Sequence, residues 1–319
     1  MRVLVTGATG FVGRYLCPLL TERGHQVTAA VREVPVVAIS GANRTVAVGG
    51  IGPDTDWSEA LDGIEGIIHL AARTHVMKDR ATDPEGLYRD VNVGGTTGLA
   101  AAAINYGILR FVYLSSVKAL AERSGKQTLN ESMSPAPEDA YGRTKLEAEK
   151  ALLAIARGTD MKAVILRPPL IYGPGVKANL LKLLKACDKR LPLPLKLIKN
   201  KRSLIYLGNL ADALICVLEA DGLSVETFLV SDGEAVSTPE LVRRISDALG
   251  RSPRLAPVPV WVLQLAGALT GKTDIIERLT GSLEIDDSNI REQLGWTPPF
   301  SMLQGLAQTA AWFNDQESR

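Results

Sequence analysis

The chain has 319 residues, more than one typical domain, and its 46% hydrophobic and 22% charged content is typical of a globular protein. A net charge of +1 lacks the basic excess of a nucleic-acid-binding surface, so nucleic acid is not an expected partner. Cys17, Cys187 and Cys216 are scattered through apolar stretches, which predicts free buried thiols in a reducing cytoplasm.

The first half of the chain alternates strand-like and helix-like segments. We expect strands at Val3–Val5, Val27–Val31, Arg44–Val48, Gly66–Ala71, Phe111–Leu114 and Lys162–Leu166. We expect helices from the glycine-rich stretch Gly7–Gly13 to Glu22 and over Asp56–Leu61, Pro84–Tyr106 and Tyr141–Ala156. This alternation predicts an α/β fold, a Rossmann-type doubly wound parallel sheet with helices on both faces. Such sheets bind ligands beyond the carboxyl ends of their strands.

The regular alternation ends after Arg167, where prolines begin to interrupt the sequence. We expect residues 1–167 to form a dinucleotide-binding domain and residues 168–319 to form mainly a smaller C-terminal substrate domain. Residues 203–221, with a strand-like run and a helix from Asn209, are expected to return to the first domain.

No segment has the pattern of an exported or membrane-spanning sequence. Arg2 leads directly into the first strand, so no signal peptide is expected. The most apolar later stretch, Val258–Leu269, is shorter than the roughly 20 residues that cross a bilayer. We expect a half-buried helix or a substrate lid there, with a role at the membrane surface as the alternative, and no integral membrane segment.

Three glycines, Gly7, Gly10 and Gly13, follow an expected strand and open an expected helix, which is the context of a dinucleotide-binding loop. The first makes a tight turn, the second lets the backbone approach a pyrophosphate, and the third allows helix and strand to pack closely. The N-terminus of the helix then offers N–H groups and a partial positive charge to the phosphates.

Tyr141 and Lys145 lie one turn apart on the same face of an expected helix. The positive charge of Lys145 is expected to lower the pKa of Tyr141 from its usual value of about 10. A tyrosine tuned in this way exchanges a proton with an alcohol or carbonyl oxygen near neutral pH. With a dinucleotide site upstream, the pair predicts hydride-transfer chemistry.

These motifs together resemble the extended short-chain dehydrogenase/reductase family, the group of nucleotide-sugar epimerases, dehydratases and reductases. The resemblance covers nearly the whole chain and combines the G-x-x-G-x-x-G loop with Tyr-x-x-x-Lys. The other matching stretches are His69–Ala72, Asn92–Thr96, Tyr113–Ser116, Arg167–Gly175 and Leu294–Pro298. Several linked motifs in the right order are more specific than any one of them.

The resemblance implies roles for individual residues. Ser116 would hydrogen-bond the reacting substrate oxygen, Tyr141 would be the acid/base, and Lys145 would hold the nicotinamide ribose. Ser115 competes for the role of Ser116, which its position in the motif favours. The expected cofactor contacts are Gly7, Thr9, Gly10, Phe11, Val12, Gly13, Arg32, Leu70, Ala71, Ala72, Tyr141, Lys145 and Pro168.

Substrate contacts are expected at His75, Ser116, Asn179 and Arg202. By the same resemblance Asn92 would tether the backbone of the active-site wall. His69 lies inside an apolar strand and is expected to be a core residue. No cluster of His, Cys and Asp has metal-ligand spacing, so no metal is expected.

The cofactor preference depends on the end of the second strand. Family members that prefer NAD usually have an acidic residue there, whereas this strand ends Ala30-Val31-Arg32. An arginine suits a 2′-phosphate, so NADP(H) is the expected cofactor and NAD(H) the alternative. Glu33 works against this preference, because it can neutralise Arg32 or itself reach the ribose.

Asn179 and Arg202 match positions at which relatives bind the diphosphate of a nucleotide sugar, and Leu191–Pro194 resembles the loop that grips the base, most often uracil. A UDP-sugar is therefore the expected substrate. Ser116 is followed by Val117-Lys118 and not by the Asp-Glu pair of dehydratases, which argues against dehydration.

The resemblance implies chemistry at C4 of the sugar, as in bacterial polysaccharide synthesis. We expect reduction of a UDP-4-keto-6-deoxy-(N-acetyl)hexosamine, with 4-epimerisation of a UDP-hexose by tightly bound NAD as the alternative. A non-catalytic cofactor-sensing regulator is a remote alternative, since such relatives usually lack the tyrosine or the lysine. Relatives also pair the helices expected at Pro84–Tyr106 and Tyr141–Ala156 across a dimer interface, so a homodimer is expected.

Overall fold

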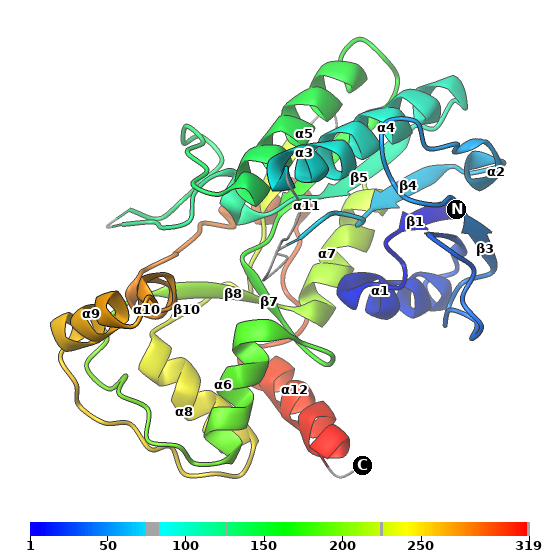
Figure 1. Ribbon diagram of the computed structural model, residues 1–319. Coiled ribbons are helices and arrows are strands. Elements are labelled where there is room, and N and C mark those ends of the chain that lie inside the picture. The colour runs from blue at the N-terminus through cyan, green and yellow to red at the C-terminus, as the bar shows by residue number, and fades with distance from the viewer. Residues whose placement is uncertain (75–82, 126, 224–225, 318–319) are drawn as a thin grey trace.

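The computed structural model describes residues 1–74, 83–125, 127–223 and 226–317 (Figure 1). Its largest element is a seven-stranded sheet in the order β3-β2-β1-β4-β5-β6-β9, in which every pair of neighbours is parallel. The strands are β1 (Arg2–Thr6), β2 (Gln26–Val31), β3 (Arg44–Ala47), β4 (Gly66–His69), β5 (Arg110–Leu114), β6 (Lys162–Arg167) and β9 (Glu226–Leu229). The predicted doubly wound α/β fold is confirmed, and its strand order reverses between β1 and β4, where such sheets bind ligands.

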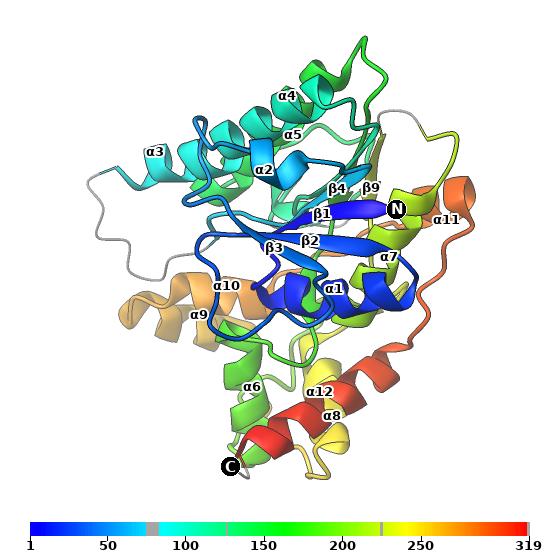
Figure 2. The same ribbon diagram turned by 90° about the vertical axis from the view of Figure 1, so that its right-hand side faces the viewer.

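Helices cover both faces of this sheet (Figure 2). On one face lie α1 (Phe11–Glu22) and α7 (Leu207–Glu219), and on the other lie α2 (Ser58–Leu61), α4 (Gly95–Asn105) and α5 (Ala140–Ala156). Successive side chains of a strand point to opposite faces. Val3 and Val5 of β1 accordingly join the hydrophobic cluster of α1 and α7, whereas Leu4 joins that of α4 and α5.

The single helix expected over Pro84–Tyr106 is interrupted. It consists of α3 (Pro84–Arg89), a π-helical turn at Asp90–Gly94 and α4. The glycines of this region lie against the chain near Pro53, where a Cβ on Gly95 would come within 2.4 Å of the Ile51 side chain. Turns of this kind occur frequently at functional sites, and this one carries Asn92.

A smaller unit lies beyond the carboxyl edge of the large sheet. Its three strands, β7 (Leu170–Tyr172), β8 (Arg202–Tyr206) and β10 (Ala235–Val236), pair in the order β10-β8-β7. Its helices are α6 (Ala178–Asp188), α8 (Thr238–Ala248), α9 (Val260–Leu269), α10 (Thr273–Thr280) and α12 (Met302–Glu317), whereas α11 (Ser288–Leu294) packs against β9 of the large sheet. The strand-like run expected within residues 203–221 is β8 and belongs to the small sheet, while α7, which follows it, packs on the large one.

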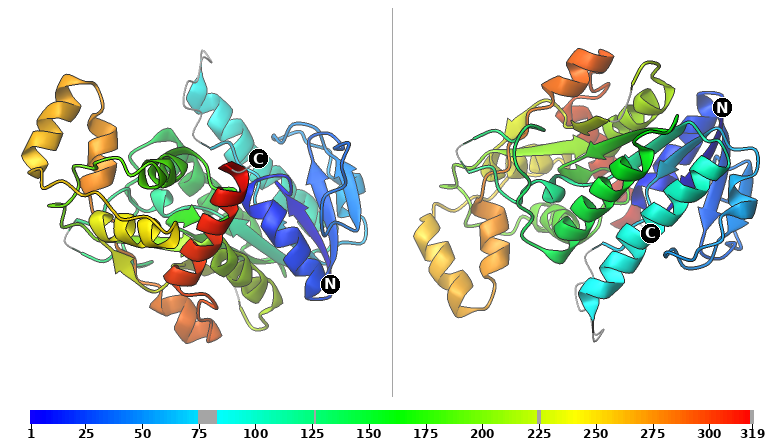
Figure 3. Two further views of the ribbon diagram at one scale, coloured as in Figure 1. Left: turned by 90° about the horizontal axis from the view of Figure 1, so that it is seen from below. Right: turned by 90° about the horizontal axis from the view of Figure 1, so that it is seen from above.

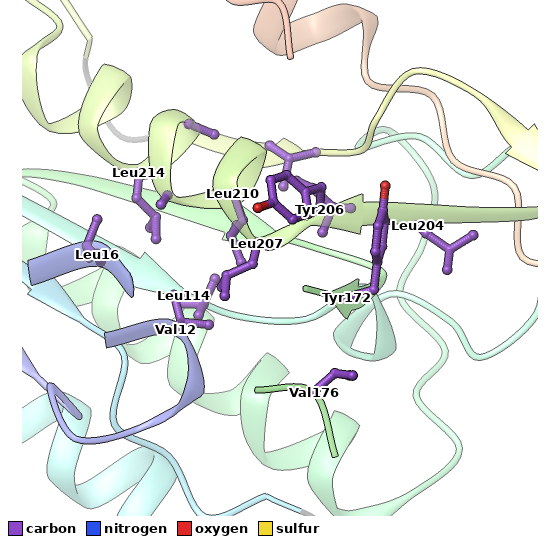
Figure 4. Packing of buried hydrophobic residues seen from close by; sticks show 14 of the residues in the cluster. Val12, Leu16, Leu114, Tyr172, Val176, Leu204, Tyr206, Leu207, Leu210 and Leu214 are labelled. Atoms are coloured by element: carbon purple, nitrogen blue, oxygen red, sulfur yellow. The ribbon is translucent and has the colours of Figure 1, made fainter. Parts of the chain in front are cut away.

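One hydrophobic cluster connects the two units. Figure 4 shows Leu16 of α1 and Leu214 of α7 in this cluster, which continues through Tyr206 to Tyr172 of β7. The rings of Tyr172 and Tyr206 lie 5.7 Å apart between centroids and are both fully buried. This shared core fixes the small unit against the large sheet and so fixes the site between them.

Candidate active site

The loop between β1 and α1 is built for an anionic ligand. Gly7 has a φ of +69°, and a Cβ there would lie 2.9 Å from the backbone nitrogen of Ala71. A Cβ on Gly13 would lie 2.4 Å from the carbonyl oxygen of Gly7, so both positions require glycine. Helix α1 begins at Phe11 with no side-chain cap and no acidic residue in its first turn. Its free N–H groups therefore fit a dinucleotide pyrophosphate.

The other expected cofactor residues follow the carboxyl ends of neighbouring strands. Leu70–Ala72 follows β4 beside the glycine loop, and the backbone nitrogen of Ala71 donates to Thr6 Oγ1 at 3.2 Å. Arg32 is exposed directly after β2. Pro168 follows β6, and its carbonyl accepts from the Val117 nitrogen at 2.9 Å. These positions lie along the carboxyl edge of the large sheet, and their contacts with a cofactor stay predictions.

Two basic residues that the sequence analysis did not identify lie beside this loop. Arg14 and Lys177 line a cavity of about 260 Å³ together with Thr9, Gly10 and Phe11. Arg14 Nε donates to the carbonyl of Thr9 at 2.8 Å, which holds the guanidinium next to the loop. Their positive charges suit phosphate oxygens. Arg14 could have been found from its place in the first turn of the helix that follows the glycines.

Ser116 and Tyr141 meet where the segment after β5 contacts the start of α5. Asp139 caps α5 by accepting from the Gly142 nitrogen at 2.7 Å. A Cβ on Gly142 would lie 2.5 Å from the carbonyl oxygen of Lys118, so this glycine allows the close approach. A side-chain hydrogen bond joins Tyr141 to Ser116.

Ser115 has a different partner. Its hydroxyl donates to Glu149, and the Arg167 guanidinium donates to both oxygens of the same carboxylate at 3.0 and 2.6 Å. Ser115, Glu149 and Arg167 are all buried. The structure therefore engages Ser115 in a buried ionic network and leaves Ser116 as the serine beside Tyr141. Glu149 was not identified from the sequence, although it continues the spacing of Tyr141 and Lys145 along one helix face.

Burial controls the protonation of the Tyr141–Lys145 pair. Desolvation raises the pKa of Tyr141 to about 12, while its hydrogen bond to Ser116 acts in the opposite direction. The expectation that Lys145 brings the pKa of Tyr141 below 10 is therefore wrong for this structure. The cost of placing a phenolate away from water is larger than the effects that favour it. Tyr141 thus presents a protonated hydroxyl at neutral pH.

Lys145 is almost completely enclosed, with 1% of its surface exposed. Its Nζ donates to the carbonyl of Leu114 at 2.6 Å and lies 4.1 Å from the centroid of the Tyr113 ring. Desolvation lowers the pKa of Lys145 to about 7, and the negative charge of Glu149 opposes that shift. Glu149 therefore helps to keep this ammonium charged.

His69 and Asn92 hold the site in place. His69 is fully buried, with its ring nitrogens 2.7 Å from Thr6 Oγ1 and 3.1 Å from Thr96 Oγ1. Desolvation, helped by the charge of Lys145, lowers the pKa of His69 to about 3, so it is a neutral core residue as expected. Asn92 accepts from the Arg73 nitrogen at 2.8 Å and donates to Thr144 of α5 at 3.1 Å.

The expected substrate residues have varied surroundings. His75 lies outside the described residues. Asn179 is exposed in the first turn of α6. Arg202 is half-buried, and its Nη1 donates to the carbonyls of Arg278 at 2.9 Å and Gly281 at 3.3 Å. Part of its guanidinium is thus engaged at the end of α10, and its role toward a diphosphate stays a prediction.

Comparison with known proteins assigns the chain to a family. Residues 3–231 match the NAD dependent epimerase/dehydratase family. The chain belongs to this family. The resemblance to nucleotide-sugar epimerases and reductases of the extended short-chain type is thereby confirmed. A UDP-glucose 4-epimerase of Vibrio cholerae is 41% identical over 323 residues, which cover 99% of this chain and 97% of that protein.

Proteins similar to this chain differ in the substrates that their names give. A 3-beta-hydroxysteroid dehydrogenase of Mycolicibacterium neoaurum is 30% identical over 346 residues, covering 98% of this chain and 92% of that protein. The solved structure of MoeE5 in complex with UDP-glucuronic acid and NAD superposes with a TM-score of 0.79 at 25% identity, covering 99% of this chain and all of that one. Membership in the epimerase/dehydratase family therefore fixes the fold and the NAD-dependent type of enzyme, but not the substrate.

The residues of this family member define what the site can do. A bound nicotinamide dinucleotide would supply or accept a hydride. Tyr141 holds a proton at its hydroxyl oxygen and is hydrogen-bonded to Ser116, an arrangement that suits proton transfer to a substrate oxygen, and these two catalytic roles stay predictions. Lys145, one helical turn after Tyr141 on α5, contributes a buried positive charge.

Among the described residues no group of three or more His, Cys, Asp and Glu could hold a metal ion. Over the same ranges no helix is long and apolar enough to cross a membrane.

Proposed function

We propose that the protein is an NAD(P)-dependent oxidoreductase acting at C4 of a UDP-linked sugar, and that it reduces a UDP-4-keto-6-deoxy-(N-acetyl)hexosamine. In this reaction C4 of the ketone gains a hydride from the reduced cofactor, and the carbonyl oxygen gains a proton from Tyr141, so the ketone becomes a secondary alcohol. The observation that supports reduction most strongly is the exposed Arg32 directly after β2, which suits the 2′-phosphate of NADP(H). Tyr141 performs the same proton transfer in a reductase and in an epimerase, so it does not distinguish the two.

The preferred cofactor of this proposal is NADP(H), supported by the exposed guanidinium of Arg32 after β2. We expect Arg32→Ala to weaken NADPH binding by about tenfold to a hundredfold, because hydrogen bonds between charged groups are lost. NADH, which lacks the 2′-phosphate, should bind the variant as it binds the wild type. Titration of each nucleotide by calorimetry measures both affinities. Glu33→Gln is the matched control and should strengthen NADPH binding slightly. Equal NADPH affinity in wild type and Arg32→Ala would disprove the role of Arg32.

A second candidate is UDP-hexose 4-epimerisation, which the similarity to the Vibrio cholerae epimerase favours. The two candidates differ in how the cofactor is held. An epimerase returns the hydride to the same sugar and keeps its NAD, while a reductase exchanges its oxidised cofactor after every turnover. Purified protein should therefore release no stoichiometric NAD⁺ on denaturation and should consume NADPH with a 4-keto-6-deoxy UDP-sugar. Tightly bound NAD⁺ together with interconversion of UDP-glucose and UDP-galactose would establish the epimerase.

We also infer a homodimer through the outer sides of α3, α4 and α5. These helices pack against one another, and α3 and the end of α4 expose Leu87 and Tyr106. Light scattering at micromolar concentration should give twice the chain mass of 34.2 kDa. Leu87→Glu should shift that mass toward the monomer, because an isologous contact brings two new carboxylates together. A monomeric wild type would contradict the inference.

A further inference from the structure

Two segments of the small unit have a charge distribution unlike that of the rest of the chain. Residues 189–199 contain four lysines and arginines, residues 251–272 contain three, and neither segment contains an acidic residue. The rest of the chain holds the other 29 basic residues and all 35 acidic ones, so it carries a net charge of −6. A near-neutral protein thus concentrates positive charge in two short stretches.

The two segments lie side by side and form one surface. The Leu193 nitrogen donates to the carbonyl of Arg254 at 2.8 Å, and the Ala256 nitrogen donates to the carbonyl of Leu193 at the same distance. The Lys196 nitrogen donates to Ala256 at 3.2 Å. We call residues 189–199 and 251–272 together the basic–apolar surface. All of its basic side chains are exposed: Lys189, Arg190, Lys196, Lys199, Arg251, Arg254 and Lys272.

Helix α9 supplies the apolar part of the basic–apolar surface. It contains no charged residue, and Trp261, Leu265 and Leu269 recur every four residues with 66%, 54% and 80% of their surface exposed. Its opposite side, with Leu263 and Gly267, is buried, and Gly267 packs closely against Ile276 of α10. Figures 1 and 3 show α9 at the outer edge of the molecule, away from the large sheet. Three large apolar side chains in one exposed row indicate an interaction surface.

The charges around this surface distinguish a lipid partner from a protein partner. Basic side chains beside an apolar row that includes a tryptophan are typical of helices that lie in the interface of an anionic bilayer. An isologous contact with a second copy would instead bring positive charges against positive charges. The acidic residues of the neighbouring helix are Asp274 and Glu277, and Glu277 is paired with Arg123 at 2.9 Å. Asp188 faces Arg251 at 3.1 Å and neutralises only that one cation.

We propose that the basic–apolar surface docks the protein on an anionic lipid bilayer. Helix α9, ten residues long, lies flat with Trp261, Leu265 and Leu269 among the acyl chains near the headgroups. The surrounding lysines and arginines contact headgroup phosphates. This docking does not use the Ser116–Tyr141–Lys145 set, and the variants that test it leave the expected base-binding loop Leu191–Pro194 unchanged.

The test uses the full chain and vesicles of defined composition, with Trp261 as the reporter. Trp57 and Trp296 are buried and Trp312 is half-buried, so Trp261 is the tryptophan most open to solvent. Mixed phosphatidylglycerol and phosphatidylcholine vesicles should shift its emission to shorter wavelength and sediment the protein. Vesicles of phosphatidylcholine alone should do neither, and added salt should weaken the binding because headgroup attraction is screened.

Two variants separate the electrostatic contribution to vesicle binding from the apolar one. Lys196→Glu with Lys199→Glu should weaken vesicle binding about thirtyfold or more, because each basic residue near an anionic surface contributes roughly fivefold. Trp261→Ser with Leu265→Ser removes the fluorescent reporter, so this variant is measured by sedimentation alone, and its sedimentation with the vesicles should be abolished. Arg157→Glu at the end of α5, combined with Lys162→Glu at the start of β6, removes the same charge elsewhere, and this variant should bind vesicles like the wild type. All the substituted side chains of α9 and 189–199 are exposed, so thermal unfolding should be unchanged.

Three results would overturn the proposal. One is equal binding to both kinds of vesicle with no effect of salt. Another is retained binding by the Lys196→Glu/Lys199→Glu variant. The third is self-association of the wild type in solution that Trp261→Ser/Leu265→Ser dissolves, which would identify the same face as a contact between protein chains. Turnover measured without vesicles should be the same in wild type, in Lys196→Glu/Lys199→Glu and in Arg157→Glu/Lys162→Glu, whichever sugar is the substrate.

Discussion

Tyr141→Phe is expected to lower kcat by about 10²- to 10⁴-fold, the usual range for loss of a general acid, while cofactor affinity is retained. The variant lacks the hydroxyl that is hydrogen-bonded to Ser116, where the segment after β5 meets the start of α5. Without it a developing alkoxide must take its proton from water. Oxidation of reduced nicotinamide, followed by absorbance with the 4-keto sugar, measures the effect.

The pH dependence gives a second measure of the same residue. Because burial raises the pKa of Tyr141 to about 12, the proton-donating form exists below that pH and is lost as the pH rises through it. Tyr141 should therefore not limit the reductive rate at neutral pH, whereas the reverse oxidation should become faster toward alkaline pH. Tyr106→Phe, at the exposed end of α4, is the matched control and should keep full activity. Full turnover by Tyr141→Phe would instead indicate another proton donor, whereas full cellular function of a variant without turnover would support a cofactor-sensing role.

Glu149→Gln is expected to destabilise the fold by about 3–5 kcal/mol, because it leaves the buried Arg167 guanidinium without its carboxylate. The neutral amide is similar in shape to the carboxylate, so the loss comes from charge and hydrogen bonding with Arg167 and Ser115. Urea unfolding at pH 7 measures the difference in the free energy of unfolding. Glu147→Gln, two residues earlier in α5, breaks only an exposed pair with Arg89 and should cost far less.

The same variant should alter activity through Lys145. Desolvation already lowers the pKa of Lys145 to about 7, and the Glu149 carboxylate opposes that shift. Removing this negative charge should lower the pKa further, and a lysine is charged only below its pKa. At a given pH fewer molecules then carry the ammonium, so the loss of kcat should be larger at pH 8 than at pH 6. A loss that is the same at every pH would show that Glu149 acts through the fold alone.

Much of this site follows from local sequence patterns. The glycines of the first loop require backbone geometry that other residues do not adopt, and the structure places Gly7 at positive φ as expected. The spacing of Tyr141 and Lys145 fixes them to one face of a helix whose bounds the sequence predicts to within one residue. Strand β9 was missed, because Glu226–Leu229 is four residues long and its first two side chains are only half-buried.

Other features could not be predicted because they depend on segments far apart in the chain. The choice between Ser115 and Ser116 rests on Arg167 of β6, which, with Glu149 of α5, occupies one of the two serines. The basic–apolar surface exists because residues 189–199 and 251–272 pair across more than fifty residues.

The sequence by itself determined the family, the cofactor loop and the residues that face one another on α5, since each depends on backbone geometry or on spacing within one element. Only the tertiary structure decided which of those residues carry charge. The free energy of ionising Tyr141 or Lys145 depends on how completely other elements exclude water and on which charges they bring near. Spacing places Tyr141 next to Lys145 on one helix. Burial against β5 then raises the pKa of Tyr141, so that it keeps its proton, and lowers the pKa of Lys145, so that it loses its proton more easily.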